Sequence, residues 1–327
     1  MSKQYTIDFG DPDFSDMDFG RPVTPAGDDM RSASLRMQLR DKESLFDGTI
    51  YYMSFGSGSS GNSSYIGTRR GGVIVDVGVR AEIITAKLAS YGIGMDKVKG
   101  VLLTHDHTDH SKFVYTLLRN NKHLRLYCTN RVLNALLRRH NISRRVKDYH
   151  VPIFKEFEFK LGEFTITPFE VPHDAADNAG FHFQAGDRHF VIATDMGAVT
   201  DRACHYMQQA NYLVIESNYD SRMLAEGPYP EYLKARIRTT HGHLDNADCA
   251  RVLASAAVSP KLSHVFLCHL SQDNNKPEKA LESARKALES RGLRVGWGEE
   301  TIEDRECDVQ LIALPRYEAT RLYVLRH

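Results

Sequence analysis

The sequence lacks the features that mark exported, membrane-spanning or disulfide-stabilised proteins. It contains no run of about 18 or more apolar residues, and residues 1–16 lack the basic, apolar and small-residue succession of a signal peptide. Its five cysteines are scattered, odd in number and without a Cys-x-x-Cys pair, which is typical of reduced thiols. These absences predict a cytoplasmic protein without a membrane segment.

Net charge and internal repeats are lacking as well. The chain carries 42 Lys and Arg residues against 42 Asp and Glu residues, so overall charge predicts binding neither to nucleic acid nor to a membrane surface. No repeat of fixed period is present, which argues against a solenoid. The length of 327 residues and the hydrophobic content of 42% suit one large domain or two modest ones with a sizeable core.

The first 47 residues differ in composition from the rest. Residues 1–30 contain seven aspartates against one lysine and one arginine, and their apolar residues follow no period. We interpret residues 1–47 as a flexible acidic tail, with docking on a basic face as the alternative. Residues 48–327 are assigned to one catalytic domain.

From residue 49 onward, strand-like and helix-like segments alternate. Two successive hairpins are predicted, with turns at Gly162 and at Gly186-Asp187, and a helix that starts near residue 130 is predicted to be capped by Asn130. The strands occur in two groups, each interleaved with helices. This order predicts two sheets packed together and flanked by helices, an α/β fold.

One short stretch concentrates metal-binding side chains. "VLLTHDHTDH", residues 101–110, is a buried strand followed by three histidines and two aspartates within six positions. His105 and His107 are spaced to point to one side, while Asp109 and His110 follow on a tight turn and face a second point. Two adjacent metal sites are therefore predicted, each needing further ligands. The alternative is a helix start with Asp109 as its cap and the histidines in solvent.

"HDHTDH" matches the HxHxDH motif of the metallo-β-lactamase superfamily. The other positions of that signature follow in order: Asp76, His173, Asp195 and His269. Within the superfamily, "GSGSSGNSSYI", "ESNYDSRMLAEGPYP", "GHLDN" and "HLSQDNNKPEKA" resemble the YycJ/WalJ-type exonuclease branch over residues 50–300. "GHLDN" departs from the usual GHLSN of this branch at Asp245.

The resemblance implies a fold and a ligand set. The fold is an αββα metallo-β-lactamase sandwich, with two packed mixed sheets flanked by helices in a single domain. The implied ligands are His105, His107 and His173 for one ion, Asp109, His110 and His269 for the other, and Asp195 as the bridge between them. Asp76 is expected behind the ligands, accepting a hydrogen bond that fixes their geometry. Two divalent ions are expected, with zinc favoured and manganese or iron possible.

Two such ions suit hydrolysis of a phosphodiester by attack of a metal-bound hydroxide on phosphorus. Asp109, Asp195 and His243 are the expected catalytic residues, and His243 or Asp109 would protonate the leaving oxygen. His243 has an alternative role in a helix-capping segment. Further candidates for contacting substrate, each with an alternative role in a turn or cap, are Ser60, Asn62, Ser271 and Asn274.

A strongly basic segment follows the ligand motif. Residues 111–147 contain no Asp or Glu, and their ten basic residues are Lys112, Arg119, Lys122, Arg125, Arg131, Arg138, Arg139, Arg144, Arg145 and Lys147. This segment, residues 112–147, predicts binding of a nucleic-acid backbone, with a solvated helix face as the alternative. The sequence therefore predicts a phosphodiesterase or exonuclease acting on nucleic acid, with DNA favoured. The alternative is a small-molecule phosphodiesterase or thioester hydrolase.

Overall fold

The computed structural model describes residues 46–139, 141–255, 259–297 and 307–326. The chain divides into two units, residues 1–47 and 48–327, and the description below concerns the second. The acidic tail lies almost entirely outside the described residues, so its flexibility and its docking stay predictions, as does the domain assignment.

The first sheet has seven strands in the order β15-β1-β2-β3-β4-β5-β6. Their bounds are β1 (Ile50–Gly56), β2 (Ser63–Thr68), β3 (Gly71–Val75), β4 (Val98–Leu102), β5 (Leu126–Cys128), β6 (His150–Pro152) and β15 (Tyr323–Leu325). Strands β1, β2 and β3 form an antiparallel meander, whereas β3, β4, β5 and β6 are parallel. The carboxyl ends of the parallel strands therefore lie at one edge of the sheet.

The second sheet has eight strands in the order β13-β14-β12-β11-β10-β9-β8-β7. Their bounds are β7 (Phe159–Leu161), β8 (Phe164–Glu170), β9 (Ala179–Ala185), β10 (Arg188–Ala193), β11 (Tyr212–Glu216), β12 (His264–Cys268), β13 (Val295–Gly296) and β14 (Val309–Ala313). Both predicted hairpins are confirmed, with Gly162 and Gly186 at positive φ in the β7–β8 and β9–β10 turns. Strands β10, β11, β12 and β14 are parallel.

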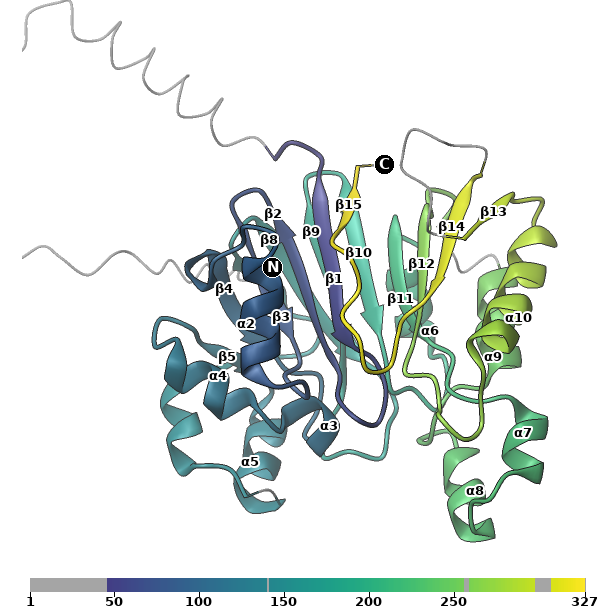
Figure 1. Cartoon of the computed structure of the whole chain (residues 1–327), viewed down its shortest axis with the longest axis horizontal. Coiled ribbons are helices and arrows are strands. Elements are labelled where there is room, and N and C mark those ends of the chain that lie inside the picture. Colours follow the sequence, from purple (N-terminus) through teal and green to yellow (C-terminus); the bar gives the residue numbers. More distant parts are fainter. Residues whose placement is uncertain (1–45, 140, 256–258, 298–306, 327) are drawn as a thin grey trace, which may run out of the picture. The chain divides into compact units, whose positions relative to one another are not determined.

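Helices cover the outer face of each sheet (Figure 1). Their bounds are α2 (Ala81–Ala89), α3 (Thr108–Ser111), α4 (Val114–Asn120), α5 (Asn130–Arg139), α6 (Asp201–Met207), α7 (Ser221–Glu226), α8 (Glu231–Ile237), α9 (Asn246–Ala254) and α10 (Pro277–Glu289), with short 3₁₀ turns η1 (Met95–Lys97) and η2 (Arg144–Tyr149). Helices α2, α4 and α5 pack on the first sheet, and α6, α9 and α10 pack on the second.

The two sheets face each other through aromatic side chains. The ring of Tyr52 on β1 lies 5.0 Å from that of Phe190 on β10 and 4.7 Å from that of Phe266 on β12. All three rings are buried, and such tilted aromatic contacts add to the stabilisation from burial alone. The layers are therefore helix, sheet, sheet and helix, which confirms the predicted αββα sandwich.

The cap of α5 differs from the prediction. Asn130 is the first residue of the helix and is exposed, whereas the Thr129 hydroxyl oxygen accepts a hydrogen bond, 3.3 Å long, from the amide of Val132. The same hydroxyl donates to the Asp177 carboxylate at 2.7 Å. Thr and Asn both cap helices well, so the second contact with Asp177 decides which residue takes the position.

The C-terminal segment joins the two sheets. Strand β14 pairs with β12 in the second sheet, and β15 pairs with β1 in the first. Between them, Thr320 and Ser54 exchange hydrogen bonds through main-chain and side-chain atoms. No helix among the described residues is long and apolar enough to cross a membrane.

Candidate metal centre

The predicted ligands lie where strands of both sheets end. Asp76 follows β3, residues 105–110 follow β4, His173 follows β8, Asp195 follows β10 and His269 follows β12. Each of these strands runs in the same direction within its own sheet, so their carboxyl ends share one edge. Side chains that are distant in the sequence are thereby gathered at one edge of the sandwich.

Three of these positions have a left-handed backbone. The φ angles are 60° at Asp76, 53° at Asp195 and 54° at His269, and among the described non-glycine residues only Glu156 shares this sign. Side chains other than glycine adopt this region at a cost in free energy, and such residues concentrate at functional sites. Neighbouring groups hydrogen-bond to the backbone at all three positions: Asp76 donates its amide to the Leu102 carbonyl, Asn178 donates to the Asp195 carbonyl, and His269 donates its amide to the Ser57 hydroxyl.

The first triad consists of His105, His107 and His173, whose ligand atoms lie within 4.8 Å of one another. His173 donates from Nδ1 to the carbonyl oxygen of Gly242 at 2.9 Å, which leaves the lone pair of its Nε2 available. This Nε2 lies 3.3 Å from His107 Nδ1. The arrangement suits three neutral imidazoles around one ion.

His105 provides a test of whether a metal ion fits. The side chain is fully buried, and its Nδ1 lies 2.9 Å from the Thr104 hydroxyl. Its Nε2 has no hydrogen-bond partner among the described residues. Burial, with repulsion from His110, lowers the pKa of His105 well below its usual value, so the ring is neutral. A buried lone pair without a donor is costly unless a metal ion occupies it, so the site fits a metal.

The second triad consists of Asp109, His110 and His269, again with ligand atoms within 4.8 Å of one another. His110 donates from Nδ1 to Asp76 Oδ2 at 2.8 Å, and the role of Asp76 in fixing the ligand geometry stays a prediction. The Nε2 of His110 then faces Asp109 Oδ2 at 3.5 Å, and His269 Nε2 lies 3.4 Å from the same oxygen. Two imidazoles and a carboxylate therefore converge on one point.

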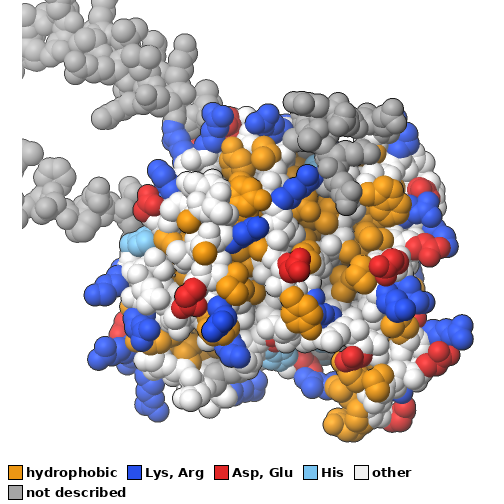
Figure 2. Space-filling model, in the orientation of Figure 1, with side chains coloured by type: hydrophobic (Ala, Val, Ile, Leu, Met, Phe, Trp, Pro, Cys, Tyr) orange, Lys and Arg blue, Asp and Glu red, His pale blue; other side chains and the backbone are white. Residues whose placement is uncertain are grey.

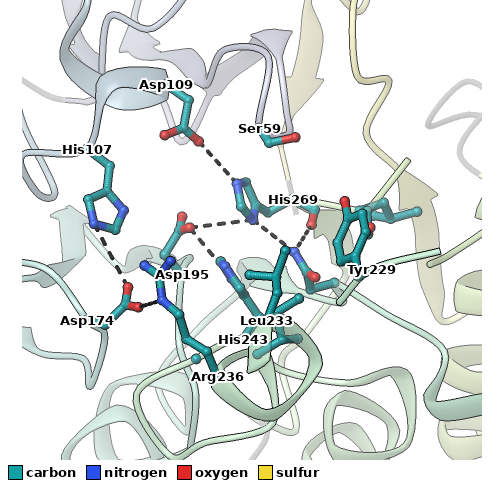
Figure 3. Close-up of a pocket in the computed structure, with 15 residues that line it drawn as sticks. Ser59, His107, Asp109, Asp174, Asp195, Tyr229, Leu233, Arg236, His243 and His269 are labelled. Carbon is teal, nitrogen blue, oxygen red and sulfur yellow. Dashed lines mark hydrogen bonds and ion pairs between the residues drawn. The ribbon is translucent and has the colours of Figure 1, made fainter. Parts of the chain in front are cut away.

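Asp195 lies between the two triads (Figure 3). Its Oδ2 is 3.2 Å from His110 Nε2, and its Oδ1 is 3.4 Å from His269 Nδ1 and 3.9 Å from His173 Nε2. Burial would raise the pKa of this carboxyl, but His269 and His110 hold it well below its usual range. An ionised carboxylate in contact with both triads has the position required of a bridging ligand.

The carboxylates make the cluster attractive to cations. Burial would lower the pKa values of His110 and His269, but Asp195 together with other nearby carboxylates raises both, that of His269 to about 10. The buried carboxylates are thus stable only if positive charge in the cluster compensates them. A divalent cation provides that charge, so the charge balance agrees with the donor set.

Glu216 was not predicted from the sequence. It ends β11, is fully buried, and its Oε1 accepts a hydrogen bond from His243 Nδ1 at 2.7 Å and lies 3.1 Å from His269 Nδ1. Burial would lower the pKa of His243, but the Glu216 carboxylate outweighs burial and raises it. The available signal was an acidic residue at the end of an apolar run, "NYLVIE", which is also the first residue of the quoted string "ESNYDSRMLAEGPYP", yet it was given no role there.

Among the predicted substrate contacts, Asn62 lies against the candidate ligands. Its Nδ2 donates to Asp109 Oδ2 at 3.0 Å and lies 2.9 Å from His110 Nε2. Ser60 is exposed, and it is the neighbouring Ser59 that lines the cavity described below. Asn62 therefore organises ligands from a buried position.

The other two candidates lie in one turn. Ser271 lines the cavity, and its hydroxyl oxygen accepts hydrogen bonds from the main-chain and side-chain nitrogens of Asn274. Asn274 is buried and does not line the cavity. The departure at Asp245 lies outside the cavity lining too, where its carboxylate caps α9 by accepting from the Asp248 amide at 2.6 Å.

A cavity of about 260 Å³ opens beside the cluster. It is lined by candidate ligands and by residues that sequence reasoning missed, among them Asp174, Tyr229, Leu233 and Arg236 (Figure 3). His243 also lines it. The metal cluster is therefore accessible from this cavity.

Two packed mixed sheets between helical layers, with histidines and carboxylates meeting at their strand ends, define a metal-dependent hydrolase of the metallo-β-lactamase fold. The family described as "Beta-lactamase superfamily domain" matches residues 78–269, and the chain belongs to this family. Within it the chain belongs to the YycJ/WalJ-type branch, which confirms the resemblance seen in the sequence.

Three similar proteins support this assignment. Exodeoxyribonuclease YycJ of Bacillus anthracis is 32% identical over 268 residues, 80% of this chain and 97% of the relative. Exodeoxyribonuclease WalJ of Streptococcus pneumoniae is 32% identical over 246 residues, 75% of this chain and 90% of the relative. The crystal structure of the metallo-β-lactamase fold protein YhfI from Bacillus subtilis shares the fold, with a TM-score of 0.60, 15% identity, and coverage of 85% of this chain and 100% of YhfI.

Proposed function

We propose that this protein is a dinuclear metal-dependent exodeoxyribonuclease, which removes nucleotides from DNA ends by hydrolysing phosphodiester bonds. The single observation that carries the proposal is the meeting of two ligand triads at Asp195. The names of the relatives YycJ and WalJ support DNA as the substrate. The imidazole-rich ligand set favours zinc, while Asp109 and Asp195 also admit manganese or iron.

Each side chain has a defined task in this proposal. His105, His107 and His173 would hold one ion, Asp109, His110 and His269 would hold the other, and the Asp195 carboxylate would serve both. Two bound divalent ions would supply polarisation of the phosphate and acidification of a water molecule. Asp76 keeps the His110 ring in the orientation that leaves Nε2 for the metal.

His243 is proposed to donate the proton that the leaving oxygen needs. Glu216 accepts the hydrogen bond from His243 Nδ1, so Nε2 is the ring atom left to exchange a proton in the cavity. The Glu216 carboxylate also stabilises the protonated ring. Asp109, the other candidate, is already hydrogen-bonded to Asn62 and close to both second-triad imidazoles, which makes it a ligand in this proposal.

The basic segment, residues 112–147, is proposed as the platform for the DNA backbone. All ten of its Lys and Arg residues are exposed, and Figure 2 shows basic side chains at the lower left, where Figure 1 places α4 and α5. Helix α5 contacts both loops that carry first-triad ligands, through Arg139 to Asp106 at 3.6 Å and Thr129 to Asp177 at 2.7 Å. A strand bound along α5 thus reaches the cluster.

A cytoplasmic location is also part of the proposal. No disulfide joins any of the five cysteines, all of which lie among the described residues, and Cys128, Cys249 and Cys268 are buried. Burial raises the pKa of each of these three thiols, which keeps them protonated and unreactive. Free structural thiols are typical of a reducing compartment.

The test is activity of the full chain after reconstitution with zinc, manganese or iron in turn. End-labelled DNA, RNA of the same sequence, a small phosphodiester and a thioester are supplied separately, and bound metal is measured. We expect two ions per chain and release of nucleotides from DNA. His173→Ala should lower the metal content and abolish release, whereas His205→Ala, at an exposed histidine on α6 outside both the cluster and the basic segment, should change neither. Saturation at one ion, or hydrolysis of the small substrates without DNA, would overturn the proposal.

A further inference from the structure

Arg236 on α8 reaches the cavity without being part of the metal cluster. Its Nε donates to Asp174 Oδ2, and its side chain is 59% exposed. The other carboxylate oxygen of Asp174 lies 3.5 Å from His173 Nε2 and 3.9 Å from His107 Nε2. In Figure 3 the guanidinium extends between Asp174 and Asp195 into the cavity. A cation thus lies one carboxylate away from the first triad.

An apolar surface adjoins this cation. Leu233, one turn before Arg236 on α8, lines the same cavity, as does Tyr229 just before the helix. The Tyr229 hydroxyl donates to Asp273 Oδ2 at 3.0 Å, which fixes the ring at the cavity wall. We call Tyr229, Leu233 and Arg236 the α8 wall. It combines a fork of N–H donors with a face suited to a base or sugar.

The cavity suits a small ligand. Its volume of about 260 Å³ is slightly below the range of roughly 300–1,000 Å³ that is typical of small-molecule sites. One nucleotide is therefore a better match than a longer segment of strand. The cavity has the metal cluster on one side and the α8 wall on the other (Figure 3).

We propose that the α8 wall binds the terminal nucleotide of a DNA strand, with Arg236 exchanging its contact with Asp174 for a phosphate oxygen. This inference rests on the proposed function, because it names the part of the substrate that the cavity takes. Asp174 holds the guanidinium in position before substrate arrives, and the phosphate replaces one anionic partner by another. A guanidinium binds phosphate in a bidentate manner, which an ammonium group cannot reproduce.

The first test measures equilibrium binding of deoxyadenosine monophosphate to the metal-loaded full chain. We expect Arg236→Gln to weaken binding at least about tenfold, Arg236→Lys to have an intermediate effect, and metal content to stay unchanged. Arg222→Gln is the matched control, because Arg222 is an exposed arginine paired with Glu226 on neighbouring α7 and does not line the cavity. Equal binding by Arg236→Gln and the native chain would overturn the proposal, and so would absence of binding to the native chain.

A second arm separates the apolar part of the wall from the phosphate contact. Leu233→Ala should weaken binding of deoxyadenosine monophosphate while leaving binding of inorganic phosphate unchanged, because only the nucleotide has a base and sugar. An equal loss of affinity for deoxyadenosine monophosphate and for inorganic phosphate would contradict a contact between Leu233 and the base or sugar. If the native protein digests DNA and Arg236→Gln digests it with the same KM, the proposed role of the α8 wall is wrong while the proposed function stands. If nucleotide binding depends on Arg236 but DNA is not digested, the proposed function fails instead.

Discussion

Hydrogen bonds behind the ligands decide which imidazole nitrogen faces a metal ion. The carbonyl of Gly242 accepts from His173 Nδ1, and the carboxylate of Asp76 accepts from His110 Nδ1. Because these oxygens accept, each Nδ1 carries a hydrogen, and Nε2 is the ring atom left to face a metal ion, which would replace any proton held there. The geometry of the cluster therefore depends on groups that do not themselves bind metal.

Asp76→Asn tests this dependence without disturbing the backbone. Asn tolerates the left-handed φ of 60° at this position, so the change removes the carboxylate charge and leaves the turn intact. We expect metal affinity to fall by about 10–100-fold, because His110 loses its ionised acceptor. Metal titration with thermal unfolding as a check on folding measures this. Asp187→Asn, in an exposed hairpin turn, is the control, and native affinity in Asp76→Asn would contradict the role.

His182 makes a separate contribution that depends on pH. It is buried on β9, with Nε2 2.9 Å from His189 Nδ1. Burial, followed by repulsion from His189, lowers the pKa of His182 from 6.5 to about 4. Between about pH 6.5 and about pH 4 the unfolded chain binds a proton at His182 that the folded chain does not, so the free energy of unfolding falls as the pH falls. At about pH 5 the loss is about 2 kcal/mol relative to neutral pH.

The variant His182→Gln should lose this part of the pH dependence. Denaturant unfolding at about pH 7 and about pH 5 gives the slope, and His123→Gln, at an exposed histidine, should keep the native slope. The metal ligands are the same in both variants, so the difference between them reports on His182. An unchanged slope in His182→Gln would show that the ring is protonated as easily in the folded as in the unfolded chain.

At the scale of residues, the proximity of side chains in a dense local motif was predictable, whereas Glu216 and Arg236 were missed. Residues 105–110 follow one strand, so their proximity is encoded locally. Glu216 and Arg236 acquire their contacts only when β11 and α8 pack beside segments that are distant in the sequence. Thr129 and Asn130 are both good caps, and the choice between them depends on Asp177, 48 positions away.

At the scale of elements, the C-terminal segment closes the sandwich. It passes from β14 in the second sheet to β15, which covers the edge of β1 in the first. Leu325 on β15 is buried, next to the buried Ile50 of β1 in the register. Covering an edge strand protects unpaired backbone groups from pairing with other chains. The described residues 307–326 thus have a structural role.

Leu325→Ala should therefore destabilise the fold. Removing a buried leucine side chain costs about 2–5 kcal/mol of unfolding free energy, depending on how far the site collapses. Arg326→Ala, at the next and exposed position, should change it by less than about 0.5 kcal/mol. Equilibrium denaturation measures both. A loss under about 0.5 kcal/mol for Leu325→Ala would mean that β15 detaches before the rest of the protein unfolds.

Elements with local partners were predictable for the same reason as the motif. Hairpins β7–β8 and β9–β10 have their turn glycines between the paired strands, so the sequence carries both strand and partner. The pairing of β14 with β12 and of β15 with β1 joins segments that no turn connects. These strands find their partners only through burial in the assembled sandwich, and a single sequence does not show which distant segments are buried together.

At the scale of the whole molecule, charge is segregated within a chain that is neutral overall. The 42 basic and 42 acidic residues cancel, yet the basic segment contributes ten exposed cations without an acid between them. We therefore expect long-range repulsion between the protein and DNA to be small, and local attraction to be concentrated on the proposed platform, the basic segment. Salt should weaken such binding by screening this one surface.

The double variant Arg131→Gln/Arg138→Gln removes two exposed charges from α5 without touching Arg139, which pairs with Asp106 next to the ligands. If both contact phosphates, the slope of log affinity for a DNA oligonucleotide against log salt concentration becomes shallower by up to about 2. The matched control, Arg285→Gln/Lys286→Gln, removes two charges from α10, which packs on the other sheet. Equal slopes in the two double variants would show that net charge, and not the basic segment, governs binding, because each variant removes two positive charges, from α5 in one case and from ion pairs with Glu289 and Glu282 on α10 in the other.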